Sequence, residues 1–136
     1  MNGSGVDRLG FEPDHVVQEF GYDSDVDNDF RFAIEDLCGS ELEDEDYTGS
    51  ADAALLWWRD GDGDLGEALI DMVGIVEDGG FVVLVTPGTH APGAIEASEI
   101  ADGAQTAGLH TSGGSTPIGP DWRATKLVAP RSRSRR

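Results

Sequence analysis

Cysteine and histidine are scarce in this sequence. Cys38 is the only cysteine among 136 residues, and the three histidines are His15, His90 and His110. A single cysteine excludes an internal disulfide and every zinc site that needs several thiolates. The histidines share no helical spacing, and no Gly-x-Ser-x-Gly elbow is present. We therefore predict no catalytic residue and no metal ligand.

Long hydrophobic runs are also missing. No segment approaches the roughly 20 apolar residues of a membrane span, and residues 1–11 lack the apolar core of a secretory signal. The sequence therefore predicts a cytoplasmic protein with no membrane association.

Basic residues are outnumbered three to one. The chain has 9 Lys and Arg against 27 Asp and Glu, which gives a net charge of -18. Residues 1–78 hold 23 of the acidic residues and 3 arginines, whereas residues 79–136 hold 4 acidic and 6 basic residues. A field of this sign repels phosphate backbones, so direct nucleic-acid binding by the body is disfavoured. A basic protein or peptide, or a cationic ligand, is the compatible partner; solubility alone is the alternative explanation.

Strand and helix patterns alternate along the chain. We expect strands at residues 15–20, 52–58, 81–85, 109–112 and 123–128, each a short apolar or β-branched run. We expect helices at residues 30–38, 65–76 and 98–107, where apolar side chains recur at helical spacing. Residues 40–47 fit either an edge strand or a loop.

This alternation predicts an α/β fold, with one three-layer Rossmann-like domain over residues 1–130. Its sheet should be mostly parallel, with a closing antiparallel strand pair from the last two strands. Residues 131–136, ArgSerArgSerArgArg, are basic and of low complexity, which is typical of a disordered tail.

Helix ends are marked by polar residues and glycines. Asp27 or Asn28 can cap the first helix, and Asp64 lies in capping-box spacing before Glu67 in the second. We expect Gly79 to close the second helix.

One face of the third helix is small and apolar. Ile100, Ala101, Ala104 and Ala107 are expected to point inward. Gly103 should weaken this helix by about 1 kcal/mol relative to alanine.

The stretch ADAALLWWRDGDGD at residues 51–64 runs from an apolar block into alternating aspartates. Asp60, Asp62 and Asp64 match the first three ligand positions of an EF-hand loop. Leu65 and Asp71, however, occupy the positions of its glycine and its bidentate glutamate, so a calcium loop is not predicted.

Two acidic clusters, at residues 23–29 and 60–64, each follow a predicted strand and precede a predicted helix. Carboxylates there are stabilised by the helix dipole and by free N–H groups. The carboxyl ends of strands are also where open α/β sheets bind ligands. The clusters therefore either cap helices and aid solubility, or face a shared crevice that holds a hydrated cation or a basic peptide.

The rim of such a crevice would include Trp58 with Asp60, Asp62 and Asp64. Trp57 and Trp58 are adjacent in a strand, so their rings should lie on opposite faces of the sheet. Arg59 and Asp60 are expected to form an ordinary surface pair.

The segment GluPheGlyTyrAspSerAsp, residues 19–25, resembles the first motif of class I S-adenosylmethionine-dependent methyltransferases, an acidic residue followed by x-Gly-x-Gly-x-Gly. Segments 75–87, 107–109 and 122–128 are similar to later parts of that fold. The resemblance implies a cofactor site at Glu19, Gly21, Asp23 and Asp25. Asp23 and Asp25 stand at glycine positions, where their side chains would occupy cofactor space.

A more specific resemblance covers LLWWRDGDGDLGEAL, ELEDEDY and AGLHTS, which are similar to a small actinobacterial family known only as domain of unknown function 3052. It implies a cytoplasmic bacterial protein and supplies no activity. We predict a non-catalytic interaction or regulatory module with a degenerate methyltransferase-like fold, with no cofactor, that engages a basic partner. The alternative is an S-adenosylmethionine-dependent methyltransferase with an altered cofactor loop.

Overall fold

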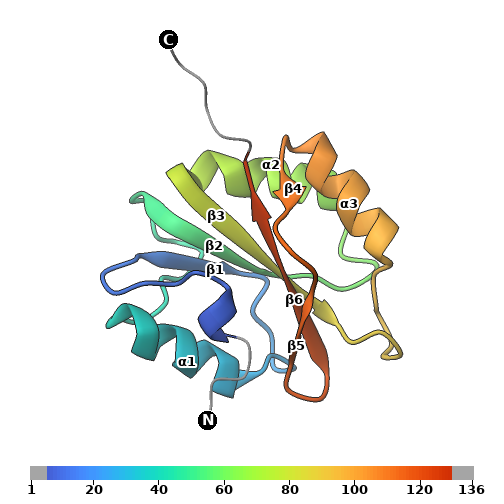
Figure 1. Cartoon of the computed structure of the whole chain (residues 1–136), viewed down its shortest axis with the longest axis horizontal. Helices are drawn as coiled ribbons and strands as arrows, with labels where there is room; N and C mark the ends of the chain where they lie inside the picture. The colour runs from blue at the N-terminus through green and yellow to red at the C-terminus, as the bar shows by residue number, and fades with distance from the viewer. Residues whose placement is uncertain (1–5, 130–136) are drawn as a thin grey trace.

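A six-stranded sheet lies between α1 on one face and α2 and α3 on the other (Figure 1). The computed structural model describes residues 6–129, so the predicted basic tail lies outside the described residues. The elements in chain order are η1 (Val6–Arg8), β1 (Val17–Phe20), α1 (Asn28–Cys38), β2 (Ala51–Trp57), α2 (Leu65–Ile75), β3 (Val76–Pro87), α3 (Ala97–Thr106), β4 (His110–Thr111), β5 (Thr116–Ile118) and β6 (Trp122–Val128). Within residues 6–129, no helix has the length and apolar character that a membrane crossing needs.

The strand order is β1-β2-β3-β6-β4, and β5 also pairs with β6. β1, β2 and β3 pair in parallel, while β6 is antiparallel to β3, β4 and β5. β6 therefore runs against the direction that the other described strands share. This confirms the predicted α/β fold with a mostly parallel sheet and an antiparallel closure.

The chain changes direction across the sheet between β1 and β2. After β1 it passes through α1 to Glu43, which bridges Gln18 on the edge of β1 away from β2. It then returns to form β2 on the other edge and continues through α2 to β3. The sequence of residues 40–47 fitted either an edge strand or a loop. In the structure this segment contributes the single bridge at Glu43. In open α/β sheets such a switch point is where the ligand crevice usually lies, here outside the carboxyl ends of β1 and β2.

Aspartate caps begin the two helices that follow these strands. The Asp27 side chain accepts a hydrogen bond from the Phe30 N–H at the start of α1. The Asp64 side chain accepts one from the Glu67 N–H at the start of α2. Each carboxylate satisfies an N–H that has no partner within the helix. The Asp64 cap was predicted, and the structure selects Asp27 of the two candidates for α1.

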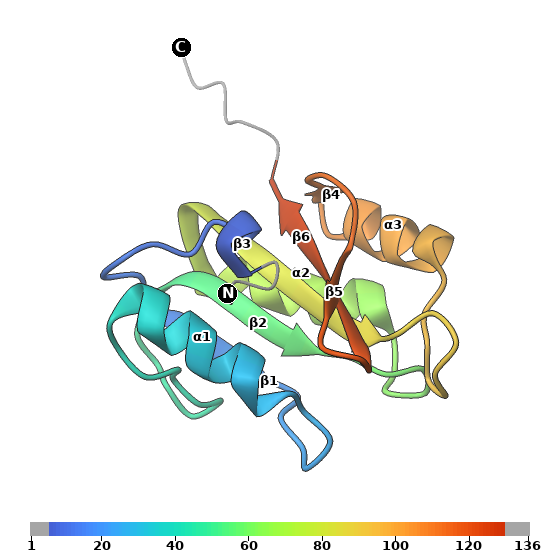
Figure 2. The ribbon, with the colours of Figure 1, turned by 60° about the horizontal axis from the view of Figure 1, so that its bottom comes forward.

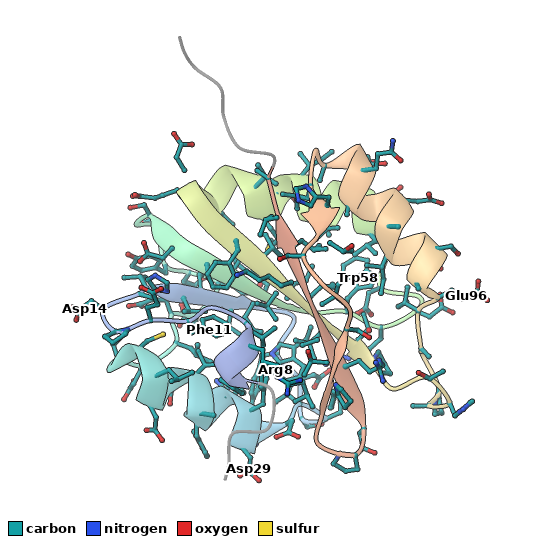
Figure 3. All side chains as sticks on the ribbon, in the orientation of Figure 1. Arg8, Phe11, Asp14, Asp29, Trp58 and Glu96 are labelled. Carbon is teal, nitrogen blue, oxygen red and sulfur yellow. The ribbon has the colours of Figure 1, made fainter. Side chains whose placement is uncertain are left out.

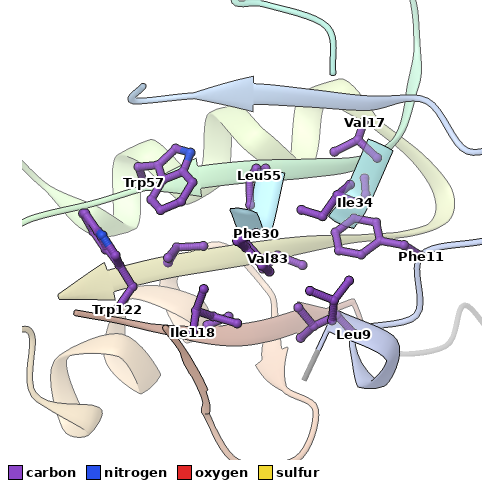
Figure 4. Close-up of a cluster of buried hydrophobic side chains, with 14 of the residues drawn as sticks. Leu9, Phe11, Val17, Phe30, Ile34, Leu55, Trp57, Val83, Ile118 and Trp122 are labelled. Carbon is purple, nitrogen blue, oxygen red and sulfur yellow. The ribbon is translucent and has the colours of Figure 1, made fainter. Parts of the chain in front are cut away.

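Strand alternation divides the apolar residues into two cores. Trp57 lies in the core under α1, together with Phe30 and Ile34, as the close-up in Figure 4 shows. Trp58 lies in the core under α2 and α3, together with Leu69. The two tryptophan rings are therefore on opposite faces, as predicted.

The predicted end of the second helix was wrong. α2 ends at Ile75, and Val76 is already extended and pairs with Ala51 of β2. Gly79, expected to close the helix, lies within β3 at a φ of +86°, where the register shifts before Phe81. The β-branched Val76 finds a strand partner, and this tertiary pairing replaces the glycine-closed helix end.

The inward face of the third helix also differs from the prediction. Ala101 is exposed, whereas Gly103 is buried. A Cβ on Gly103 would lie 3.0 Å from Cγ of Leu65 on α2. Gly103 therefore does more than weaken the helix: it lets α3 approach α2 closely.

The α1 side of the core gives a matched test of this packing. Ile34 is fully buried and Phe32, on the same helix, is 54% exposed. We expect Ile34→Ala to lower the free energy of unfolding by about 2–5 kcal/mol, because it leaves a cavity. Phe32→Ala should change it by less than about 0.5 kcal/mol. Urea denaturation of both variants checks this, and equal losses would contradict the assigned face of α1.

Candidate functional site

The candidate site lies at the carboxyl ends of β1 and β2, where two loops meet. Residues 21–27 connect β1 to α1 and residues 58–64 connect β2 to α2. Figure 2 shows α1 and α2 leaving this end of the sheet on opposite faces. The two predicted acidic clusters are therefore neighbours in space, as their positions after parallel strands indicated.

The Arg59 side chain joins the two loops. Its Nη2 and Nε donate to the two carboxylate oxygens of Asp25, at 2.6 and 3.1 Å, in a bidentate pair. Its Nη1 donates to the backbone carbonyl of Gly21 at 2.9 Å. Arg59 was expected to pair with Asp60 on the surface; instead it reaches across the switch point, because the fold places Asp25 there.

Gly21 brings the first loop directly onto the end of β2. Its φ is +78°, and a Cβ at this position would lie within van der Waals overlap of the Trp57 carbonyl oxygen. Only glycine fits here, because the loop after β1 packs directly against the end of β2 and leaves no room for a side chain.

Two further contacts hold the loop of residues 21–27. Nε1 of Trp122 on β6 donates to the Asp25 carbonyl at 3.1 Å. The Gly21 N–H donates to the Glu45 carboxylate at 2.9 Å. The Arg59 guanidinium also lies 5.3 Å from the centre of the Trp122 ring. The loop is thus bound to β2, to β6 and to the segment around Glu45.

Glu19 lies buried beside this loop and is fully engaged. Its side chain is 6% exposed and forms a bidentate pair with Arg31, at 2.7 and 2.8 Å. Nε1 of Trp57 donates to the same carboxylate at 2.8 Å. The hydrogen bonds that Arg31 donates to Glu19 raise the pKa of Arg31 above its usual value. A buried carboxylate needs such partners to stay charged.

The predicted rim residues serve mainly local structure. Trp58 is 9% exposed and packed into the core under α2 and α3. Asp62 accepts a hydrogen bond from the Arg59 N–H, and Asp64 caps α2. Asp60 is exposed, as is Asp23, whose carboxylate accepts from the Ser24 N–H.

The described residues contain neither a group of side chains suited to metal binding nor an exposed thiol. In the described part of the chain, no group of three or more His, Cys, Asp or Glu side chains is placed to hold a metal ion. Cys38 is buried, and burial raises the pKa of its thiol. A protonated, buried thiol is a poor nucleophile.

Sequence reasoning missed the roles of Arg31 and Trp122 and gave Arg59 the wrong partner, although all three organise the site. Each is a donor to an acidic residue or carbonyl far away in the sequence, 97 positions away for Trp122 and Asp25. The one available signal was the scarcity of arginine and lysine. Residues 1–78 contain 23 carboxylates, and their only Lys or Arg residues are Arg8, Arg31 and Arg59. When a strongly acidic segment has only a few cations, each of them is expected to pair with a carboxylate.

The fold is that of a Rossmann-like domain and is similar to the fold of several methyltransferases. Precorrin-6y C5,15-methyltransferase from Geobacter metallireducens superposes with a TM-score of 0.63 at 9% identity, covering 92% of this chain and 85% of that one. Magnesium protoporphyrin IX methyltransferase from Synechocystis PCC 6803, solved with bound SAM, gives 0.55 at 12% identity, covering 92% and 74%. At such identities the similarity establishes the fold alone.

The chain belongs to the family described as "Protein of unknown function (DUF3052)", whose sequence model matches residues 6–131. Uncharacterized proteins of Mycobacterium tuberculosis and Mycobacterium bovis are 47% identical over 127 residues, which cover 93% of this chain and 79% of theirs. Both resemblances found in the sequence are thereby confirmed.

The Arg59–Asp25 pair makes a pH-dependent prediction. Hydrogen bonding to Arg59 lowers the pKa of Asp25 below its usual 3.8. Because the folded pKa is the lower one, the pair's stabilisation is present above about pH 4 and is lost as the pH falls through the folded value. Carboxyl NMR titration should show the pKa of Asp25 rising in Arg59→Met. An unchanged pKa would contradict the pairing, and Asp60 in the same spectra serves as the control.

Proposed function

We propose that this protein is a non-catalytic interaction module whose cofactor crevice is closed by its own side chains. The observation that carries the proposal is Arg59, which bridges from β2 to the Asp25 carboxylate and the Gly21 carbonyl across the switch point. In a nucleotide-binding Rossmann domain this space receives the ligand.

The backbone of the loop supports the same conclusion. A nucleotide loop offers free N–H groups and bare main chain to its ligand. Here the Gly21 N–H is taken by Glu45 and the Ser24 N–H by Asp23. Gly21 lies so close to the Trp57 carbonyl that no ligand atom fits between them. Glu19 is likewise occupied by Arg31 and Trp57.

The outer surface of this edge suits a basic partner. The segments 21–29, 41–46 and 59–64 contain twelve acidic residues and one arginine. The Arg59–Asp25 and Gly21–Glu45 contacts connect these three segments. Asp23, Asp29 and Asp60 are exposed on them. A surface with this charge attracts cationic peptides and repels nucleic acid. We place the protein in the cytoplasm as part of this proposal.

The alternative function is an S-adenosylmethionine-dependent methyltransferase. It is favoured by the fold, which is similar to that of enzymes such as the Synechocystis enzyme solved with bound SAM. It requires Arg59 to release Asp25 so that a cofactor can enter.

Calorimetry separates these two functions. We expect no binding of S-adenosylmethionine or S-adenosylhomocysteine at ligand concentrations up to about 1 mM, because closing contacts occupy the crevice. A methyltransferase of the same fold provides the positive control. A dissociation constant in the micromolar range would show that the crevice admits the cofactor, would favour the methyltransferase alternative and would overturn the proposal.

A titration with a nonapeptide of alternating Arg and Ser tests the partner chemistry. We expect binding that weakens sharply between about 50 and 300 mM salt, because exposed carboxylates are screened. The double variant Asp23→Asn and Asp60→Asn should bind several-fold more weakly than Glu99→Gln with Asp102→Asn on α3, which also removes two charges. Equal losses, or binding that ignores salt, would contradict an interaction surface at this edge.

A further inference from the structure

A groove of about 930 Å³ lies between α3 and the strands β3 and β6, near the carboxyl end of β3. The connection from β4 to β5 forms its other wall. Its apolar lining includes Pro87, Ile95 and Ile100. The volume is that of a site for a small molecule. None of the residues that line this groove belongs to the loops at the ends of β1 and β2.

Two buried hydroxyl groups line this groove without partners. Thr86 on β3 is 3% exposed and Thr125 on β6 is 5% exposed. Among residues 6–129, neither hydroxyl makes a hydrogen bond to another protein group. Both lie on the face of the sheet that otherwise carries apolar side chains of the core under α2 and α3, such as Leu84 and Leu127. A buried hydroxyl without a partner is unfavourable, so valine would pack better here unless a ligand is bound.

A cation lies beside these hydroxyls. Arg123 is the strand partner of Thr86 and lines the same groove. Its Nε and Nη2 donate to the Ser115 hydroxyl, at 2.9 and 2.6 Å, which fixes the guanidinium. Nη1 of Arg123 has no hydrogen-bond partner within the described part of the chain. A guanidinium held in this way is ready to bind an acidic group.

The start of α3 contributes to the same groove. Glu96 and Ala97 line it, and Figure 3 shows Glu96 at the N-terminal end of this helix. Glu96 makes no side-chain cap, and the first hydrogen bond from the helix to Glu96 comes from the Ile100 N–H. The N–H groups of the first turn are therefore free, and they favour a negative charge.

We propose that this groove binds a small carboxylate with an apolar body. The carboxylate is held by Arg123 and the two threonine hydroxyls near the start of α3, and the apolar body lies against Ile95 and Ile100. A single guanidinium with Glu96 at the rim favours a monoanion over a doubly charged phosphate, because the Glu96 carboxylate repels the second charge. The groove is a second site, independent of the switch-point crevice and of the proposed basic partner.

Amide chemical-shift mapping by NMR tests the proposal with three probes that each carry a phenyl group. These are 3-phenylpropionate, its neutral analogue 3-phenylpropanamide, and phenyl phosphate. We expect the propionate, at concentrations up to about 10 mM, to shift the amides of Ala97, Gly113 and Thr125 with a dissociation constant on the order of 1 mM. The amide and the phosphate should bind at least several-fold more weakly.

Three variants complete the test. Arg123→Gln should weaken propionate binding about tenfold, whereas Lys126→Gln, which removes a charge from the other face of the same strand, should leave it unchanged. Thr125→Val should raise the melting temperature of the free protein and still weaken binding several-fold, a combination that a purely structural threonine would not produce. The far-ultraviolet spectrum of each variant confirms folding.

Several outcomes would overturn the proposal. These are an absence of shifts with 3-phenylpropionate, equal binding of the amide, tighter binding of the phosphate, or equal effects of Arg123→Gln and Lys126→Gln. Shifts confined to residues 21–25 would place the ligand in the switch-point crevice and equally reject the groove.

Discussion

The contact of Arg59 with Asp25 and with the Gly21 carbonyl is the interaction on which the carboxyl edge of the sheet depends. It joins the loops after two neighbouring parallel strands, at the point where this class of fold ordinarily admits a nucleotide. Trp122 and Glu45 hold the same loop from two other directions. These contacts are made by charged groups of the protein itself, and exposed carboxylates such as Asp23 and Asp60 lie on the same loops.

The high acidity of the first 78 residues has several separate causes. Asp27 and Asp64 cap helices, Asp62 accepts a hydrogen bond from the Arg59 N–H, and Glu19 balances Arg31 in the interior. These local roles explain why the alternating aspartates after β2 resemble a calcium loop without its remaining ligands. Carboxylates such as Asp60 have no such role and account for the exposed negative surface.

Two neighbouring regions at the carboxyl edge of the sheet offer different chemistry. The loops after β1 and β2 are acidic and bonded to one another, which is the basis for proposing a basic partner. The groove beside α3 instead combines a fixed guanidinium with buried hydroxyls and an apolar wall. Similarity to methyltransferases predicts neither arrangement, because a shared fold constrains the path of the chain more tightly than it constrains the side chains.

The sequence by itself determined the alternation of the main strands and helices without β5, the Asp64 cap, the opposite faces of Trp57 and Trp58, and the family. These features depend on local periodicity and on residues within a few positions of each other. The end of α2, the role of Gly103, the pairing of Arg59 with Asp25 and the groove of Thr86, Thr125 and Arg123 were decided only by tertiary structure. Each requires segments distant along the chain to pack together, and no local pattern encodes which arginine meets which carboxylate.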